Sequence, residues 1–303
     1  MDFIATHGRL AAIAALFFVG VVLRRAGWAG APAGRWLLAF VFNVGLPVLV
    51  LGAVGGLELE REHALLPLTA ACVVFVGWGV AAFAARRFRL TPVGTGALAL
   101  TSMSMNISMV YPFAALSFVP AAFGELVLFD LGHAVVVWTV GTYAACRYAG
   151  RGGDTAMLVR RMLTAPALWM LFIVLALDAF EVRIDARVVH GSLAAGQAFV
   201  LLVPLAMGLL ATASGLRRPE VMTAVALRSG VGALAGFAFA HLLGLDGRAV
   251  AVATVGAAAP VGFSAVVLSA REGLDLELAA SAAAISVFAG SLWIPFAVAL
   301  VGG

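Results

Sequence analysis

The chain has 303 residues, of which 63% are hydrophobic and only 11% are charged. Soluble domains carry about 25% charged residues, so this composition excludes a soluble globular fold and favours a membrane protein with many spans. The formal net charge of +4 comes from arginines scattered in short clusters between apolar runs, which excludes a basic surface for nucleic acid.

Charged and turn-rich stretches divide the chain into ten apolar runs, each near the ~20 residues that cross about 30 Å of hydrocarbon. We expect spans at residues 8–23, 35–56, 64–84, 94–120, 125–147, 164–180, 193–214, 221–244, 248–270 and 277–301. Arg24 and Arg25 follow the first run, which has no small-residue cleavage site. It is therefore predicted to remain as a span rather than to be removed as a signal peptide.

Arginines concentrate in the odd-numbered loops between these spans, as at Arg86, Arg87 and Arg89 of the third loop. Positive residues in short loops stay in the cytoplasm, so the odd loops are predicted to be inside. The even loops combine few arginines with acids such as Glu58 and Glu60. Both termini are therefore predicted to lie outside a cytoplasmic (inner) membrane, with the chain crossing the lipid bilayer many times.

Prolines recur at matched places in the two halves of the chain. Pro47 of the second span has a counterpart in Pro204 of the seventh, and Pro112 of the fourth has one in Pro260 of the ninth. Each pair is five spans apart, and an odd number of spans inverts the second half relative to the first. We therefore expect two inverted five-helix repeats. The repeats are residues 1–150 and 151–303.

The fourth span contains the polar sequence MSMNISMVYPFAALSF, which begins at Met103. A mid-span proline removes a backbone donor and clashes with the carbonyl four residues earlier, so it kinks or breaks the helix. Interrupted spans at matched positions of inverted halves indicate a transporter's binding site near the middle of the membrane. The predicted substrate-binding residues are Asn106, Ser108, Tyr111, Pro112, Pro260 and Ser264. The alternative is that these prolines only kink their helices.

Charged residues inside spans are expensive and are therefore candidates for function. Asp130 and His133 lie three residues apart in the fifth span, on one helix face. Histidine titrates near neutral pH, so this pair is predicted to relay a proton as the coupling group. The alternative, which we weigh more heavily, is that Asp130 caps or pairs locally among the lipid headgroups.

Arg228 of the eighth span is a candidate counter-charge for a carboxylate, because a guanidinium group offers a fork of donors that matches it. It lies close to the cytoplasmic end of its span, so we favour the alternative that it snorkels out to the headgroups. His241, near the outer end of the same span, is expected to be interfacial. Three methionines of the fourth span, at positions 103, 105 and 109, are expected to be packing residues.

Motifs of membrane-embedded enzymes are missing from the sequence, which has no HExxH, no GxGD, no paired DxxxD and no Cys/His cluster. Cys72 and Cys146 both lie in apolar runs and are expected to pack without reacting. We therefore predict that the protein is not an enzyme, binds no metal and has no cofactor, apart from a proton or sodium gradient that drives it.

Segments spread over essentially the whole chain together resemble the auxin efflux carrier family of membrane transporters, in the bacterial branch related to the plant PIN auxin exporters. They are RRAGWAG before FNVGLPVLVL, NISMVYPFAALSFVPAAFGELVLFDLGHAVVVWTVG, TAPALWM, VPLAMGLL and AAAPVGFSAVVLSAREGLDLELAASAAAISVFAGSLWIP. In the last segment the proline, the turn, the acidic loop and the closing small-residue helix follow one another in the family's order.

The resemblance implies an all-α integral membrane fold of ten transmembrane helices in two inverted five-helix repeats. The first two helices of each repeat would form a scaffold part and the other three a transport part, in which the broken fourth and ninth helices cross. It also implies secondary transport of a small organic anion such as malonate, malate, lactate or an auxin-like acid, by an elevator-like or rocking movement, with a homodimer as one option. The alternative is a solute-binding sensor or a channel on the same fold.

Overall fold

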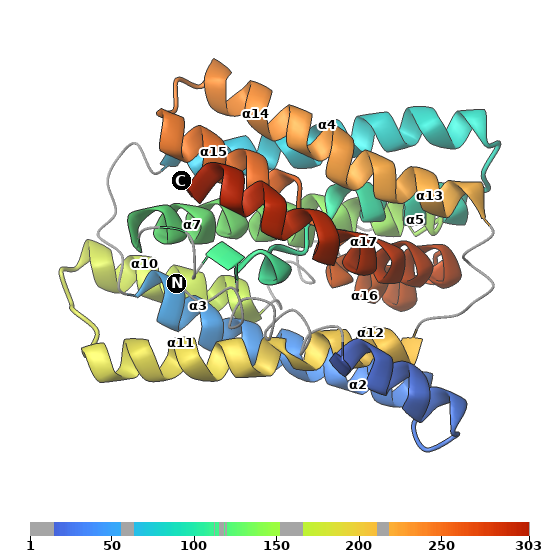
Figure 1. The fold of residues 1–303 in the computed structure, drawn as a ribbon, viewed down its shortest axis with the longest axis horizontal. Coiled ribbons are helices and arrows are strands. Elements are labelled where there is room, and N and C mark those ends of the chain that lie inside the picture. Colours follow the sequence, from blue (N-terminus) through green and yellow to red (C-terminus); the bar gives the residue numbers. More distant parts are fainter. Residues whose placement is uncertain are drawn as a thin grey trace. The chain divides into compact units, whose positions relative to one another are not determined.

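The computed structural model describes residues 15–55, 64–111, 113–114, 118, 120–151, 166–210 and 218–302. Within these ranges the chain is almost entirely helical, and the β-type pairing found there is an isolated bridge between Met105 and Val261. The chain divides into two compact units, each built from both halves of the sequence (Figure 1). The large unit comprises Met1–Leu10, Arg61–Leu158 and Ala211–Gly303, and the small unit comprises Ala11–Glu60 and Val159–Leu210.

The small unit is a group of helices that pack through glycines. Its elements are a helix at 15–25, α2 (Ala31–Phe40), η1 (Val41–Gly45), α3 (Leu46–Val54), α10 (Pro166–Ala179), α11 (Ala186–Val200) and α12 (Leu202–Leu210). A Cβ at Gly52 of α3 would lie 2.2 Å from the backbone nitrogen of Leu193 in α11, and one at Gly196 of α11 would lie 2.6 Å from Cα of Leu49. Small residues therefore allow these two helices to touch backbone to backbone, as is common in membrane proteins.

The large unit holds the remaining elements. From the first half of the chain these are α4 (Leu65–Arg87), α5 (Pro92–Met103), η3 (Ile107–Met109), α7 (Pro120–Val136), η4 (Val137–Gly141) and α8 (Thr142–Tyr148). From the second half they are α13 (Pro219–Ala226), η6 (Leu227–Val231), α14 (Gly232–Leu242), α15 (Gly247–Ala257), α16 (Phe263–Glu272) and α17 (Leu276–Gly302). Two of the connecting elements, η4 and η6, are single turns of π-helix within otherwise continuous helices.

Four helices among the described residues are long and apolar enough to cross a membrane, namely Ala31–Gly52, Leu65–Arg87, Gly124–Tyr148 and Pro219–Leu242. A bent pair, Leu276–Gly290 with Leu292–Val298, adds a fifth candidate. These five correspond to the second, third, fifth, eighth and tenth runs predicted from the sequence. The chain is therefore a multi-pass membrane protein; the first predicted span lies partly outside the described residues.

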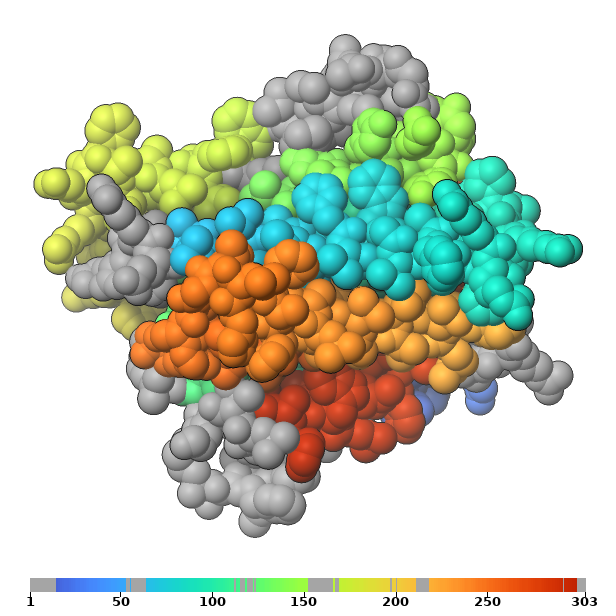
Figure 2. Space-filling model, turned by 90° about the horizontal axis from the view of Figure 1, so that it is seen from above, coloured from blue at the N-terminus to red at the C-terminus, as the bar shows by residue number. Residues whose placement is uncertain are grey.

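One face of the large unit suits contact with lipid. Figure 2 shows α4 and α14 running side by side on this face, and large apolar side chains project outward from both helices. They include Phe75 and Phe83 of α4 and Leu234, Phe237 and Leu242 of α14, all of which are exposed. Bare apolar surface of this extent is stable in a bilayer, where lipid tails cover it.

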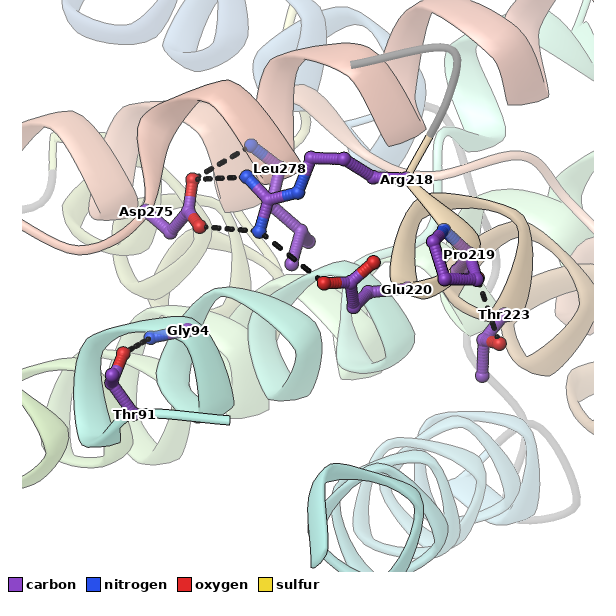
Figure 3. Close-up of polar contacts among 8 residues, drawn as sticks. All are labelled: Thr91, Gly94, Arg218, Pro219, Glu220, Thr223, Asp275 and Leu278. Carbon is purple, nitrogen blue, oxygen red and sulfur yellow. Dashed lines mark hydrogen bonds and ion pairs between the residues drawn. The ribbon is translucent and has the colours of Figure 1, made fainter. Parts of the chain in front are cut away.

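An ion pair joins two helix ends of the large unit next to the apolar spans (Figure 3). Arg218, which precedes α13, donates to both carboxylate oxygens of Asp275 at 3.2 and 2.8 Å and lies 3.8 Å from Glu220. Asp275 also caps α17 by accepting from the backbone N–H of Leu278. Burial alone would raise the pKa of Asp275, but the bonds from Arg218 and the cap outweigh it and lower that pKa.

Candidate functional site

Two interrupted helices meet in the large unit. Helix α5 ends at Met103 and α15 ends at Ala257, and short extended segments follow both. The segments pair antiparallel through Met105 and Val261. We call this pairing the crossing, and define it by residues 104–106 and 259–262.

The backbone groups freed by the two breaks bond to each other across the crossing. The N–H of Asn106 donates to the carbonyl of Pro260, and the N–H of Gly262 donates to the carbonyl of Ser104, both at 2.8 Å. A Cβ at Gly262 would lie 2.8 Å from the carbonyl oxygen of Met105, so this position requires glycine. Irregular backbone is tolerated inside a membrane only where such partners receive it.

The predicted interruptions exist, but the two prolines stand in different relations to them. Pro260 lies within the break of the ninth span and is buried. In the fourth span the break begins at Ser104, well before Pro112, which lies outside the described residues. The extended segment of the fourth span forms where residues 260–262 of the other break exchange backbone hydrogen bonds with it.

Arg228 is placed at the crossing by the π-helical turn η6. Its guanidinium donates to the carbonyl of Ser102 in the last turn of α5 and to the carbonyl of Ala257 at the end of α15, each at 2.6 Å. Its side chain is fully buried. The expectation that Arg228 snorkels to the headgroups is therefore wrong, because two helix ends inside the unit supply the acceptors that water would otherwise provide.

A glycine makes room for this arginine. A Cβ at Gly232 would lie 2.1 Å from a terminal guanidinium nitrogen of Arg228 and 2.4 Å from the carbonyl oxygen of Ala257. Gly236, one turn further, packs against Ala257 and Ala253 in the same way. The sequence spacing of Arg228, Gly232 and Gly236 was the available signal for this arrangement, because residues four apart share a helix face.

The electrostatics of the crossing follow from the helix directions. A helix C-terminus carries about half a negative elementary charge, and the cation of Arg228 bonds to two such ends. Helix α16 begins at the crossing with its positive N-terminal end, after Gly262, and no side chain caps it. Ser264 lies buried in its first turn. The side-chain oxygen of Ser104 is also buried here and has no hydrogen-bond partner among the described residues.

A chain of polar side chains runs from α7 to the crossing. The hydroxyl of Tyr111 donates to one carboxylate oxygen of Asp130 at 2.8 Å, and the other oxygen lies 3.3 Å from Nδ1 of His133. Nε2 of His133 accepts the backbone N–H of Met105 at 2.9 Å. A nitrogen that accepts carries no proton, so the proton of the neutral imidazole is on Nδ1, facing Asp130.

The other sequence-predicted residues lie beside this chain. Ser108 donates to the side-chain oxygen of Asn106 at 2.5 Å, and Asn106 is buried. Met103, Met105 and Met109 are buried as well. His241 is exposed at the end of α14 and bonds to the carbonyl of Phe237.

Several residues of the site were missed by sequence reasoning. The hydroxyl oxygen of Ser286 in α17 accepts the backbone N–H of Val261 at 3.0 Å, so a third helix provides a hydrogen-bond partner for the crossing. Glu125 of α7 is buried and pairs with Arg248 at the start of α15, with a shortest distance of 2.6 Å. The signal for Glu125 was an acid inside the predicted fifth span. No comparable signal marks Ser286, because serines are common in apolar helices.

The described residues contain no group of three or more His, Cys, Asp or Glu side chains that is arranged to hold a metal ion. Cys146 is buried and Cys72 partly so, and neither forms a disulfide. The chemistry of the crossing is therefore that of hydrogen-bond donors, one buried cation and one histidine–carboxylate pair.

No family model matches the chain, and no curated protein matches it. Among solved structures, the chain is similar to a sodium proton antiporter from Methanocaldococcus jannaschii, determined at pH 8. The TM-score is 0.61, the sequence identity is 13%, and the match covers 100% of both chains. At this identity the likeness concerns the fold alone.

Proposed function

We propose that the protein is a secondary transporter that moves a small organic anion across the membrane, and that it belongs to the auxin efflux carrier family. The solute would bind at the crossing, near the middle of the bilayer. Such a position is typical of carriers built from discontinuous helices, whose ends act on the solute directly.

The observation that carries this proposal is the position of Arg228. A crossing of two broken helices brings two negative and two positive ends together, and it can in principle serve cations or anions. Here the buried guanidinium bonds to a carbonyl of each negative end, and its positive charge disfavours a cation at either one. The uncapped start of α16 remains, and a positive helix end favours a carboxylate.

Cation transport is the second candidate, because the solved structure of similar fold is a sodium proton antiporter. Its strongest support in this chain is Asp130, a carboxylate beside the crossing. Both oxygens of Asp130 are already engaged, by Tyr111 and by His133. These contacts partly offset the negative charge that a sodium ion would meet, so we favour the anion.

Roles for the individual residues follow. We assign solute contact to Asn106, Ser108, Tyr111 and Ser264, which carry polar side chains at or next to the two breaks. Pro112 and Pro260 keep the segments from forming continuous helices. Arg228 then acts as a fixed charge that sets the sign of the site rather than as a direct counter-charge, while Asp130 and His133 couple transport to a proton gradient.

The division into two units supports an elevator-like movement. All of the crossing lies in the large unit, and the small unit draws one pair of predicted spans from each half of the chain. We propose that the small unit is the scaffold and forms a homodimer, and that the large unit carries the solute. We also propose two inverted five-helix repeats, ten spans and both termini outside the inner membrane.

The test is uptake of labelled malonate, malate, lactate and indole acetate by proteoliposomes, with and without an imposed pH gradient. We expect saturable uptake of at least one anion, lost in Pro260→Ala and kept in Pro295→Ala, which changes a proline near the end of α17. Equal losses in the two variants would refute a solute site at the crossing. Uptake of labelled sodium without any anion would favour the second candidate, and binding without accumulation would favour a sensor or channel.

A further inference from the structure

The contact between His133 and the backbone of Met105 links a titratable side chain to the crossing itself. Met105 is the residue that pairs with Val261, and its N–H donates to Nε2 of His133 at 2.9 Å. The imidazole is buried, and Asp130 holds its other nitrogen. This geometry requires the neutral form of His133, because only an unprotonated Nε2 accepts a hydrogen bond.

Protonation of His133 changes the donor count at the crossing. A proton taken from solution would bind to Nε2, and the resulting N–H would face the N–H of Met105. Two donors cannot bond to each other, so the existing hydrogen bond must break. The imidazolium stays paired with the carboxylate of Asp130, which in turn accepts from Tyr111, and the N–H of Met105 becomes available to another acceptor.

We propose that protonation of His133 creates a two-donor site, formed by Nε2–H of His133 and the backbone N–H of Met105, that binds one carboxylate group of the transported solute. This inference rests on the proposed function and deepens it. A carboxylate accepts both donors at once. The solute would then bind together with one proton, and the protein would act as a proton–anion symporter.

The charged and titratable groups around His133 are consistent with this assignment. On α7 itself they are Asp130 and Glu125, and Tyr111 reaches the carboxylate of Asp130 from the segment that follows η3. The helices packed against α7 contribute Cys72, Arg86 and Arg87 of α4 and Arg248 of α15. Glu125 is paired with Arg248, and Arg86 and Arg87 lie at the end of α4. Asp130 is thus the acid bonded to the imidazole, and the cation at the crossing, Arg228, is bonded to the carbonyls of Ser102 and Ala257.

The first experiment measures proton uptake on binding. Isothermal titration calorimetry of the purified protein with lactate, malonate and indole acetate would be run in buffers of different ionisation enthalpy. We expect about one proton taken up per bound carboxylate where the imidazole of the free protein is neutral, and an affinity that falls about tenfold for each unit of pH in that range. Binding without proton uptake would overturn the inference.

His133→Gln is the informative variant, because its amide oxygen can accept the N–H of Met105, its NH2 group can donate to a carboxylate, and it carries no titratable proton. We expect it to bind the solute with an affinity independent of pH between about pH 5.5 and about 8.5, and to exchange solute without responding to a pH gradient. His241→Gln, at an exposed histidine of α14, is the matched control and should behave as the wild type. An unchanged pH dependence in His133→Gln would also overturn the inference.

A second measurement separates this inference from the proposed function. In protein labelled with ¹⁵N-methionine, the amide signal of Met105, assigned with Met105→Leu, should move with pH in the wild type and stay fixed in His133→Gln, with no solute present. If no anion binds but this signal titrates, the anion transporter is wrong while the switch is retained. If an anion binds but the signal does not titrate, the transporter is retained and the switch is wrong.

Discussion

Two proline-containing regions of this protein respond to their prolines in opposite ways. Across Pro47 of the small unit, α2, η1 and α3 continue as one helix from Ala31 to Gly52. At Pro260 of the large unit, α15 and α16 are separate helices with an extended segment between them. The helix therefore continues through Pro47, whereas it is completely interrupted at Pro260.

The difference lies in what receives the freed backbone groups. Before Pro47 the chain forms the π-helical turn η1, so that the helix accommodates the missing backbone N–H of the proline without ending. At the crossing, Ser104, Asn106, Ser286 and the guanidinium of Arg228 bond to the freed groups from other elements. A proline therefore permits a break in a membrane helix, and tertiary partners decide whether the break forms.

We expect the largest loss of stability for Arg228→Met, which removes a side chain that bonds to both broken helices at the crossing. Each hydrogen bond from a charged donor contributes about 1.5–3 kcal/mol, so loss of both should cost about 3–6 kcal/mol, a large part of the stability of a typical fold. Thermal unfolding in detergent checks this, with Arg86→Met at the exposed end of α4 as the control. A variant as stable as its control would show that Arg228 does not support the crossing.

A smaller but still large effect is expected for Gly232→Ala. The new Cβ would meet the guanidinium of Arg228 and the carbonyl of Ala257, and overpacking of this kind costs about 1–3 kcal/mol. Gly230→Ala is the matched control, because a Cβ there meets nothing within 4 Å. Equal unfolding temperatures for the two variants would contradict the close approach of α14 and α15.

Ser286→Ala should destabilise the crossing by a smaller amount, and another serine of α17 provides the control. The change leaves the buried N–H of Val261 without its acceptor, which should cost roughly 1–2 kcal/mol. Ser281 lies on the same helix with a buried hydroxyl that has no partner among the described residues, so Ser281→Ala should leave stability unchanged or slightly higher. Denaturation of both variants in parallel gives the comparison, and a greater loss in Ser281→Ala would refute it.

The smallest effect is expected away from the crossing, at the pair of Arg218 and Asp275. Because folding lowers the pKa of Asp275, its contribution to stability is present above the unfolded value of about 3.9 and is lost as pH falls through the folded value. Asp275→Asn should therefore lower the unfolding temperature by about 1–4 °C at neutral pH and by less in acid. Glu277→Gln, at an exposed position nearby, is the control, and a difference that grows in acid would contradict the ion pair.

Sequence reasoning located the apolar helices and the polar interruption in the fourth span because composition and proline positions depend on local chemistry. It also placed Asp130 and His133 on one helix face, where they are hydrogen-bonded. It misplaced Arg228, because distance from the end of a span does not reveal the π-helical turn that points the side chain inward. The link between His133 and Met105 joins segments distant in the chain, and nothing in either segment alone predicts it.

The central claim, that the crossing favours an anion, is tested most directly at Ser264 in the first turn of α16. In a Cys72→Ala, Cys146→Ala background, Ser264→Cys would be reacted with an anionic and a cationic methanethiosulfonate, and each rate would be divided by the rate with a free thiol. We expect the anionic reagent to be favoured, and the transported anion to protect the thiol. A preference for the cationic reagent, with protection by sodium, would contradict the claim.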